Sequence, residues 1–140
     1  MQLKTSRNCH GLYNLQYHLV LVTKYRKKCI NQEVFDFINN ETIRLLKEFK
    51  IELEEINYES DHIHLLISIP PQVQISKFIN SYKTTTARLI RKEFKEHLAA
   101  FYWKNHFWSR SYLILSSGGA PIEVIKKYIQ NQEKDAAITT

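Results

Sequence analysis

The chain has 140 residues, which is the size of one ordinary domain able to bury a real hydrophobic core, so we expect a single domain over 1–140. Twenty Lys and Arg against fourteen Asp and Glu give a net charge of +6, which favours a polyanionic partner such as nucleic acid. Cys9 and Cys29 form no C-x-x-C pair, so we expect reduced thiols in a cytoplasmic protein rather than a zinc cluster. The start of the chain has no apolar signal core, and no apolar run is long enough to enter a membrane.

The first half of the chain predicts three strands and one helix. Alternating apolar and polar residues predict a strand over 13–23, and a helical apolar stripe predicts a helix over 32–49 with Asn31 as its N-cap. A second strand is expected over 51–58, with a bulge near Glu54 and Glu55 where the alternation slips. A third strand over 62–69 ends at Pro70, because proline cannot donate to the ladder.

The second half predicts a long helix over 76–97, an aromatic and basic connector over 101–110 and a fourth strand over 112–116. Gly118 and Gly119 predict a flexible hinge over 117–121, and Pro121 suits the first turn of a last helix over 122–134. The three glycines, Gly11 included, make no P-loop or dinucleotide fingerprint, so no nucleotide cofactor is expected.

The order β-α-β-β-α-β with a terminal helix is that of a ferredoxin-like α+β sandwich, in which both long helices cover one face of an antiparallel sheet and the other face stays open. In the third strand Ile63, Leu65 and Ile67 must meet the helices, which puts His62 and His64 on the open face. Two imidazoles two residues apart lie about 7 Å from each other along a strand, so both can reach one metal ion. Two solvated strand histidines explain the same spacing.

The last helix carries Tyr128 and Gln132 four residues apart, so both side chains can point at one target. A tyrosine at the margin of an apolar stripe is commonly a core-boundary residue, which is the plain alternative. Gln132 can offer a carbonyl oxygen to a cation.

These residues resemble a known family. His62-Ile63-His64 is similar to the His-hydrophobic-His signature, and Tyr128 to Gln132 is similar to the terminal Tyr-x-x-x-Gln, of the TnpA-type single-tyrosine HUH transposases of small bacterial insertion sequences. Further similarity runs through the segments 17–20, 24–26, 81–83, 87–88 and 107–112. The resemblance implies that His62, His64 and Gln132 bind Mg²⁺ or Mn²⁺ and that Tyr128 is the nucleophile.

The resemblance also implies the reaction and its partners. Attack by the phenol would leave a 5′-phosphotyrosine and a free 3′-hydroxyl, while the ion would neutralise charge on the scissile phosphate. The substrate would be single-stranded DNA with hairpins at the transposon ends, and the enzyme would act as a homodimer, since one tyrosine holds one strand end. Whether the terminal helix serves its own subunit or its partner stays open.

Basic and aromatic side chains provide generic means of binding this DNA, by contacts to phosphates and by stacking on unpaired bases. The basic candidates are Lys24, Arg26, Lys27, Lys83, Arg88 and Arg110. The stacking candidates are Tyr25, Tyr102, Trp103 and Trp108. A solvated surface for the first set and core packing for the second are the alternatives.

Two other functions fit the same sequence. One is a related HUH nuclease with a domesticated or replication-initiating role. The other is a non-enzymatic RNA-binding module of RRM type, since an open ferredoxin-like sheet is also an RNA-recognition surface. No RNP-like aromatic block lies on the predicted first or third strand, which argues against the module.

Overall fold

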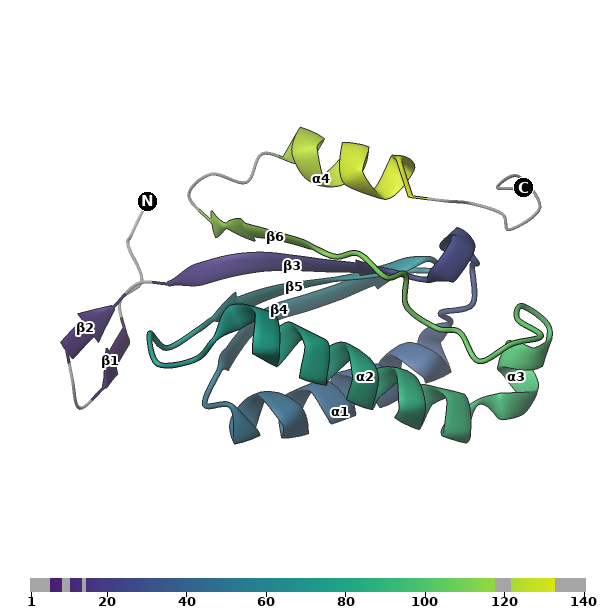
Figure 1. Ribbon diagram of the computed structural model, residues 1–140, viewed down its shortest axis with the longest axis horizontal. Helices are drawn as coiled ribbons and strands as arrows, with labels where there is room; N and C mark the ends of the chain where they lie inside the picture. Colours follow the sequence, from purple (N-terminus) through teal and green to yellow (C-terminus); the bar gives the residue numbers. More distant parts are fainter. Residues whose placement is uncertain (1–5, 9–10, 14, 118–121, 133–140) are drawn as a thin grey trace.

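Four strands form one antiparallel sheet in the computed structural model, which describes residues 15–117 and 122–132 together with the backbone of 6–8 and 11–13. The strand order is β4 (Glu52–Glu59), β5 (His62–Ser68), β3 (Gln16–Val22) and β6 (Leu113–Ser116). Helices α1 (Gln32–Glu48) and α2 (Ile75–Glu93) lie side by side across one face (Figure 1). The predicted ferredoxin-like α+β sandwich is therefore confirmed.

The main core lies between this helix layer and the sheet. Leu19 and Leu21 of β3 and Ile63 and Leu65 of β5 are completely buried there, against residues such as Phe78 of α2. At the start of α1 the side chain of Asn31 accepts a hydrogen bond from the backbone N–H of Val34, as an N-cap does. The predicted bulge in the second strand is also present, as a register shift between Leu53 and Glu55.

Three predicted boundaries differ from the structure. The first strand of the sheet begins at Gln16, because Tyr13 belongs to a separate hairpin of β1 (Ser6–Asn8) and β2 (Gly11–Tyr13) that projects from one end (Figure 1). The helix predicted over 76–97 is two helices, α2 and α3 (Lys95–Ala99), because Phe94 leaves the helical conformation and its ring packs edge-on against Phe37. The last helix, α4, spans Ile122–Gln130, and most of the predicted hinge lies outside the described residues.

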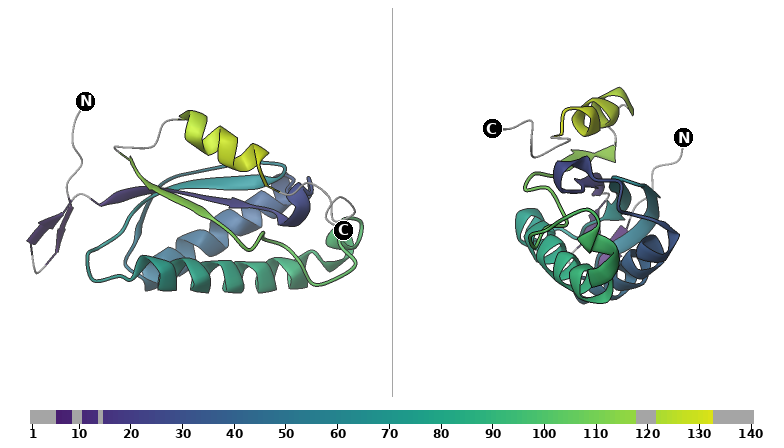
Figure 2. Two further views of the ribbon diagram at one scale, coloured as in Figure 1. Left: turned by 45° about the horizontal axis from the view of Figure 1, so that its top comes forward. Right: turned by 90° about the vertical axis from the view of Figure 1, so that its right-hand side faces the viewer.

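The second face of the sheet is not fully open, which corrects the sequence-based expectation. Helix α4 lies across it, on the side of the sheet opposite α1 and α2 (Figure 2). Ile125 packs there with Val20 and Val22 of β3 to form a second, smaller hydrophobic cluster. The C-terminal end of β3 is therefore apolar on both faces of the sheet. In this single chain, α4 rests on its own sheet.

A short 3-10 turn, η1 (Lys24–Arg26), follows β3 and changes the direction of the chain. Tyr25 and Arg26 have φ values of 59° and 54°, a left-handed conformation that is unfavourable for residues with a Cβ atom. Among the described residues, no helix is both long and apolar enough to cross a membrane.

Candidate active site

Strand β5 places both sequence-predicted histidines on the face that carries α4. His62 lies opposite Val22 and His64 opposite Val20 in the β3 register, whereas Ile63 and Leu65 point into the main core. The predicted facing of the two imidazoles is therefore confirmed. Neither ring is freely solvated, since the His62 side chain is only 17% exposed and His64 is half-buried.

The carboxylate of the residue just before β5 holds the His62 ring in place. Its Nδ1 atom lies 2.8 Å from Oδ1 of Asp61, a buried residue. The second carboxylate oxygen, Oδ2, accepts a hydrogen bond of 3.4 Å from Nε of Arg26. If Nδ1 of His62 carries the proton, its Nε2 keeps a free lone pair, which is the arrangement that a metal-binding imidazole needs.

His64 is held by another imidazole. Its Nε2 atom lies 2.7 Å from Nδ1 of His18 on β3, and the two ring centroids are 4.9 Å apart. Burial lowers the pKa of His64 below its ordinary value, and the nearby His18 and His62 lower it further. The neutral ring is thereby favoured. In the tautomer whose Nε2–H donates to His18, Nδ1 of His64 is free to bind a ligand.

Tyr128, on α4, and Gln132, two residues past the end of that helix, lie over the segment that leads into β6. The Tyr128 hydroxyl lies 2.8 Å from Oγ of Ser111, and Oε1 of Gln132 accepts hydrogen bonds of 3.1 Å from Ser111 and 3.2 Å from Ser109. Burial raises the pKa of Tyr128, an effect that the Ser111 hydrogen bond partly offsets. The phenol is therefore protonated at neutral pH and must lose its proton to act as a nucleophile.

The structure brings these four residues to one face of the sheet in two groups. Arg26 lies between the groups, since its Nε bonds to Asp61 and its Nη1 donates to the backbone oxygen of Gln130 at 3.4 Å. In the described part of the chain, no cluster of three or more His, Cys, Asp or Glu side chains could hold a metal ion. A centre on this face would thus need an oxygen donor such as Gln132, whose oxygen is occupied by two serine hydroxyls here.

The predicted DNA-contacting residues fall in different surroundings. Lys24, Lys27 and Arg110 line one cavity, described below, and Arg88 is exposed on α2. Lys83 is half-buried, donates to the backbone oxygen of Arg110 at 2.7 Å and has its pKa lowered by burial. Arg26 is paired with Asp61.

Sequence reasoning missed three polar partners of the site. His18 is separated from His64 by 46 residues, so no local pattern in the sequence predicts their contact. Ser109 and Ser111 lie in an irregular segment without periodicity, so no pattern marked them. Asp61, the residue just before His62 in the sequence, contacts the His62 imidazole.

The fold and the site together define a class of protein, namely α+β proteins that carry a tyrosine on a helix across a sheet with paired histidines. Residues 11–132 match the family described as "Transposase IS200 like", and the chain belongs to that family of DNA-processing enzymes. The resemblance inferred from the sequence motifs is thus confirmed.

Individual relatives agree with this membership. The chain is 32% identical over 124 residues to the ISDra2 transposase TnpA of Deinococcus radiodurans, covering 86% of each. It is 30% identical over 124 residues to the transposase for insertion sequence element IS200 of Salmonella typhimurium, covering 88% of this chain and 80% of the relative.

Solved structures agree on the fold. A crystal structure of a candidate transposase from Deinococcus radiodurans superposes with a TM-score of 0.84 at 29% identity, covering 93% of this chain and 99% of the other. A REP-associated tyrosine transposase bound to a REP hairpin superposes with a TM-score of 0.50 at 11% identity, covering 82% and 62%.

Proposed function

We propose that this transposase cleaves and rejoins single-stranded DNA at the ends of a mobile element through a 5′-phosphotyrosine on Tyr128. The observation that carries the proposal is the position of Tyr128, on α4, over the same sheet face as His62 and His64, with Gln132 two residues past the end of that helix. A nucleophile, candidate metal ligands and a phosphate-binding charge are the groups that such a strand transfer requires.

The chemistry follows from the phenol. The Tyr128 oxygen attacks the scissile phosphorus, an O–P bond forms, and the bond to the 3′ oxygen breaks, leaving a 3′-hydroxyl that takes up a proton. The covalent intermediate conserves the energy of the phosphodiester, so the reverse attack by a 3′-hydroxyl rejoins strands without nucleotide hydrolysis. The proton of Tyr128 must leave during attack, and Ser111 is positioned to hold the phenol oxygen in one orientation.

His62, His64 and Gln132 would hold the divalent ion, Mg²⁺ or Mn²⁺. When bound, such an ion supplies positive charge to the non-bridging oxygens of the phosphate. The two imidazoles fit such an ion, because Asp61 and His18 each engage one nitrogen of a ring and leave the other for a ligand. Gln132 would have to exchange a serine hydroxyl for the ion. These second partners also fix the ring orientations before any ligand arrives.

The substrate and assembly follow from the same reasoning. A mobile segment has two ends and each chain has one Tyr128, so we propose a homodimer. A REP-associated tyrosine transposase with the same fold is bound to a REP hairpin, which supports a hairpin next to the cleaved strand. The net charge of +6 suits such a polyanion.

The deciding experiment is a covalent-adduct assay. Wild-type protein, Mn²⁺ and a single-stranded oligonucleotide from the end of the element should give a protein–DNA band that survives denaturant. Tyr128→Phe should abolish the band while DNA binding in EDTA persists. Tyr58→Phe is the matched control, because the hydroxyl of Tyr58 bonds to Gln32 far from α4 and its loss should leave the adduct intact. An undiminished adduct in Tyr128→Phe would refute the assignment.

A further inference from the structure

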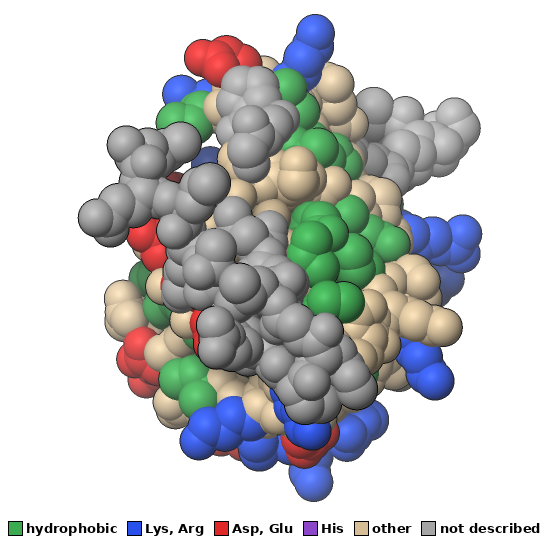
Figure 3. All heavy atoms as spheres, turned by 90° about the vertical axis from the view of Figure 1, so that its left-hand side faces the viewer, with side chains coloured by type: hydrophobic (Ala, Val, Ile, Leu, Met, Phe, Trp, Pro, Cys, Tyr) green, Lys and Arg blue, Asp and Glu red, His purple; other side chains and the backbone are tan. Residues whose placement is uncertain are grey.

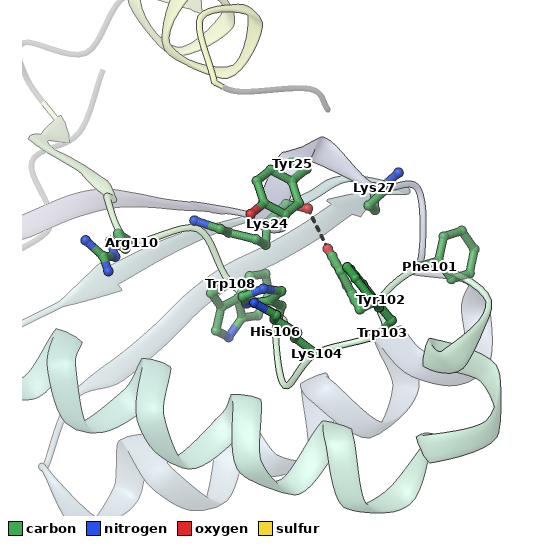
Figure 4. Close-up of a pocket in the computed structure, with 10 residues that line it drawn as sticks. All are labelled: Lys24, Tyr25, Lys27, Phe101, Tyr102, Trp103, Lys104, His106, Trp108 and Arg110. Carbon is green, nitrogen blue, oxygen red and sulfur yellow. Dashed lines mark hydrogen bonds between the residues drawn. The ribbon is translucent and has the colours of Figure 1, made fainter. Parts of the chain in front are cut away.

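A cavity of about 780 Å³ lies between η1 and the connector from α3 to β6 (Figure 4). One wall is formed by Lys24 and Tyr25 of η1 and by Lys27, which follows η1. The other wall is formed by the aromatic and basic connector. Its volume is in the range of pockets that hold small organic ligands. The site residues Tyr128, His62 and His64 do not line it.

The charge of this cavity has one sign. Four cationic side chains line it, Lys24, Lys27, Lys104 and Arg110, and none of the ten lining residues is acidic. Burial and then the nearby Lys24, Lys104 and Arg91 lower the pKa of His106 in the same wall. His106 is thereby kept as a neutral aromatic ring. At the opposite end of the molecule, Lys and Arg side chains are spread around the rim (Figure 3).

The aromatic residues of the cavity divide into two kinds. Tyr102 and Trp108 are buried and serve the fold, because the Tyr102 hydroxyl donates to the backbone oxygen of Lys24 at 2.6 Å and Nε1 of Trp108 donates to Thr86 at 2.9 Å. Trp103 is different, since it is 94% exposed. An indole left almost wholly in water beside four cations is poor for stability, and it is suited to stacking on a ligand.

The cavity is connected to the catalytic face through η1. The left-handed conformations of Tyr25 and Arg26 let neighbouring side chains separate: Tyr25 lines the cavity, while Arg26 reaches Asp61 and Gln130. Such backbone strain is maintained where a particular side-chain placement is needed. A strand that occupies the cavity is therefore adjacent to the residues that hold His62 and α4.

We propose that this cavity holds an unpaired nucleotide of the single-stranded DNA next to the cleaved bond, with its base stacked on Trp103 and its flanking phosphates on Lys24, Lys104 and Arg110. The inference rests on the proposed function for the identity of the nucleic acid. A paired duplex hides the faces of its bases, so an exposed stacking ring selects an unpaired strand. The cationic side chains on both walls would then contact the phosphates of that strand.

The test measures binding without catalysis. A fluorescein-labelled dT oligonucleotide and an abasic oligomer of equal length are titrated by anisotropy in EDTA, where Tyr128 does not react. Trp103→Ala should weaken dT binding about tenfold, and Trp103→Phe should retain most of it, because a phenyl ring still stacks. The preference of wild type for dT over the abasic oligomer should disappear in Trp103→Ala.

Charge is tested with a matched pair. Lys104→Ala should weaken the binding of both oligomers and reduce its salt dependence. Lys47→Ala, on the exposed side of α1, should do neither. Intrinsic fluorescence gives a second readout, since Trp103 and the buried Trp108 are the two tryptophans. DNA should quench the tryptophan fluorescence of the wild type and leave that of Trp103→Phe almost unchanged.

Two results would overturn the proposals, and they are distinguishable. Equal dT affinity in wild type and Trp103→Ala, or a base preference that survives the substitution, overturns the cavity proposal even when the Tyr128 adduct forms. An absent adduct in wild type overturns the proposed function even when Trp103 governs binding. Because the exposed Trp103 makes no core contact, its variants should melt as the wild type does, and circular dichroism verifies this.

Discussion

The Nδ1 atom of His18 lies 2.7 Å from Nε2 of His64, which ties one candidate metal ligand on β5 to the neighbouring strand β3. In the strand register His18 is opposite Leu66 and His64 is opposite Val20, so the contact is diagonal across the ladder. His18 therefore fixes the ring of His64 much as Asp61 fixes that of His62. The two imidazoles are oriented by different chemistry on the same sheet face.

Replacing His18 should weaken metal binding. In His18→Ala the half-buried His64 loses its partner and its ring orientation, so Mn²⁺ affinity should fall about tenfold or more, the range found for partners of metal-binding histidines. Isothermal titration with Mn²⁺ alone measures this. Gln16→Ala is the control, because Gln16 lies on the same face of β3 two residues away. Equal affinities in wild type and His18→Ala would contradict the role given to His18.

Removing Ser111 should slow cleavage more than it weakens binding. Its hydroxyl contacts both Tyr128 and Gln132, so Ser111→Ala leaves the phenol and the amide oxygen without a shared partner. We expect the single-turnover rate of adduct formation to fall about tenfold, since misoriented reacting groups lose rate steeply. Ser109→Ala, which contacts Gln132 alone, should have a smaller effect. Equal rates in both serine variants and wild type would show that the contacts are incidental.

The arrangement of strands and long helices could be predicted from the sequence because it depends on local periodicity. Ile63, Leu65 and Ile67 alternate strictly, and this pattern determines which face of β5 meets the helices. The break at Phe94 could not be predicted, because its ring leaves the helix for a tertiary contact with Phe37. The hairpin of β1 and β2 was missed for a related reason, since Tyr13 continues the alternation of β3 although it belongs to another strand.

The candidate site, like the fold, could be predicted only where it depends on local sequence spacing. The spacing of His62 with His64 is local, so strand geometry already places this pair on one face. The helix predicted to carry both Tyr128 and Gln132 ends at Gln130, so helix geometry alone does not place Gln132 beside Tyr128. The partners that orient them come from elsewhere in the chain: Ser111 is 17 residues from Tyr128, and its contact depends on how α4 docks. Val20 and Val22 were the available signal for that docking, because they make the supposedly open face of β3 apolar.

Alkaline pH should destabilise the protein through Cys29. Burial raises the pKa of this thiol from 9.0 to about 11, so the folded state resists forming the thiolate. A pKa raised by folding means that the contribution to stability is complete below pH 9 and is lost as pH rises towards 11. Urea unfolding should therefore show wild type losing about 2 kcal/mol more than Cys29→Ala over this interval. Parallel stability curves would rule out this linkage.

Truncating Ile125 should release α4 without unfolding the domain. Ile125 packs with Val20 and Val22 in a cluster separate from the main core, so Ile125→Ala removes the buried side chain of α4 and leaves the partly buried Tyr128 and Ile129 as its apolar contacts. Trypsin should then cleave after Lys126 or Lys127 about tenfold faster, while the melting midpoint changes little. Ile122→Ala is the matched control, because Ile122 is 64% exposed on the same helix and should leave the cleavage rate unchanged. A cleavage rate that is the same in Ile125→Ala and wild type would mean that α4 is held by its polar contacts to Ser109, Ser111 and Arg26 instead.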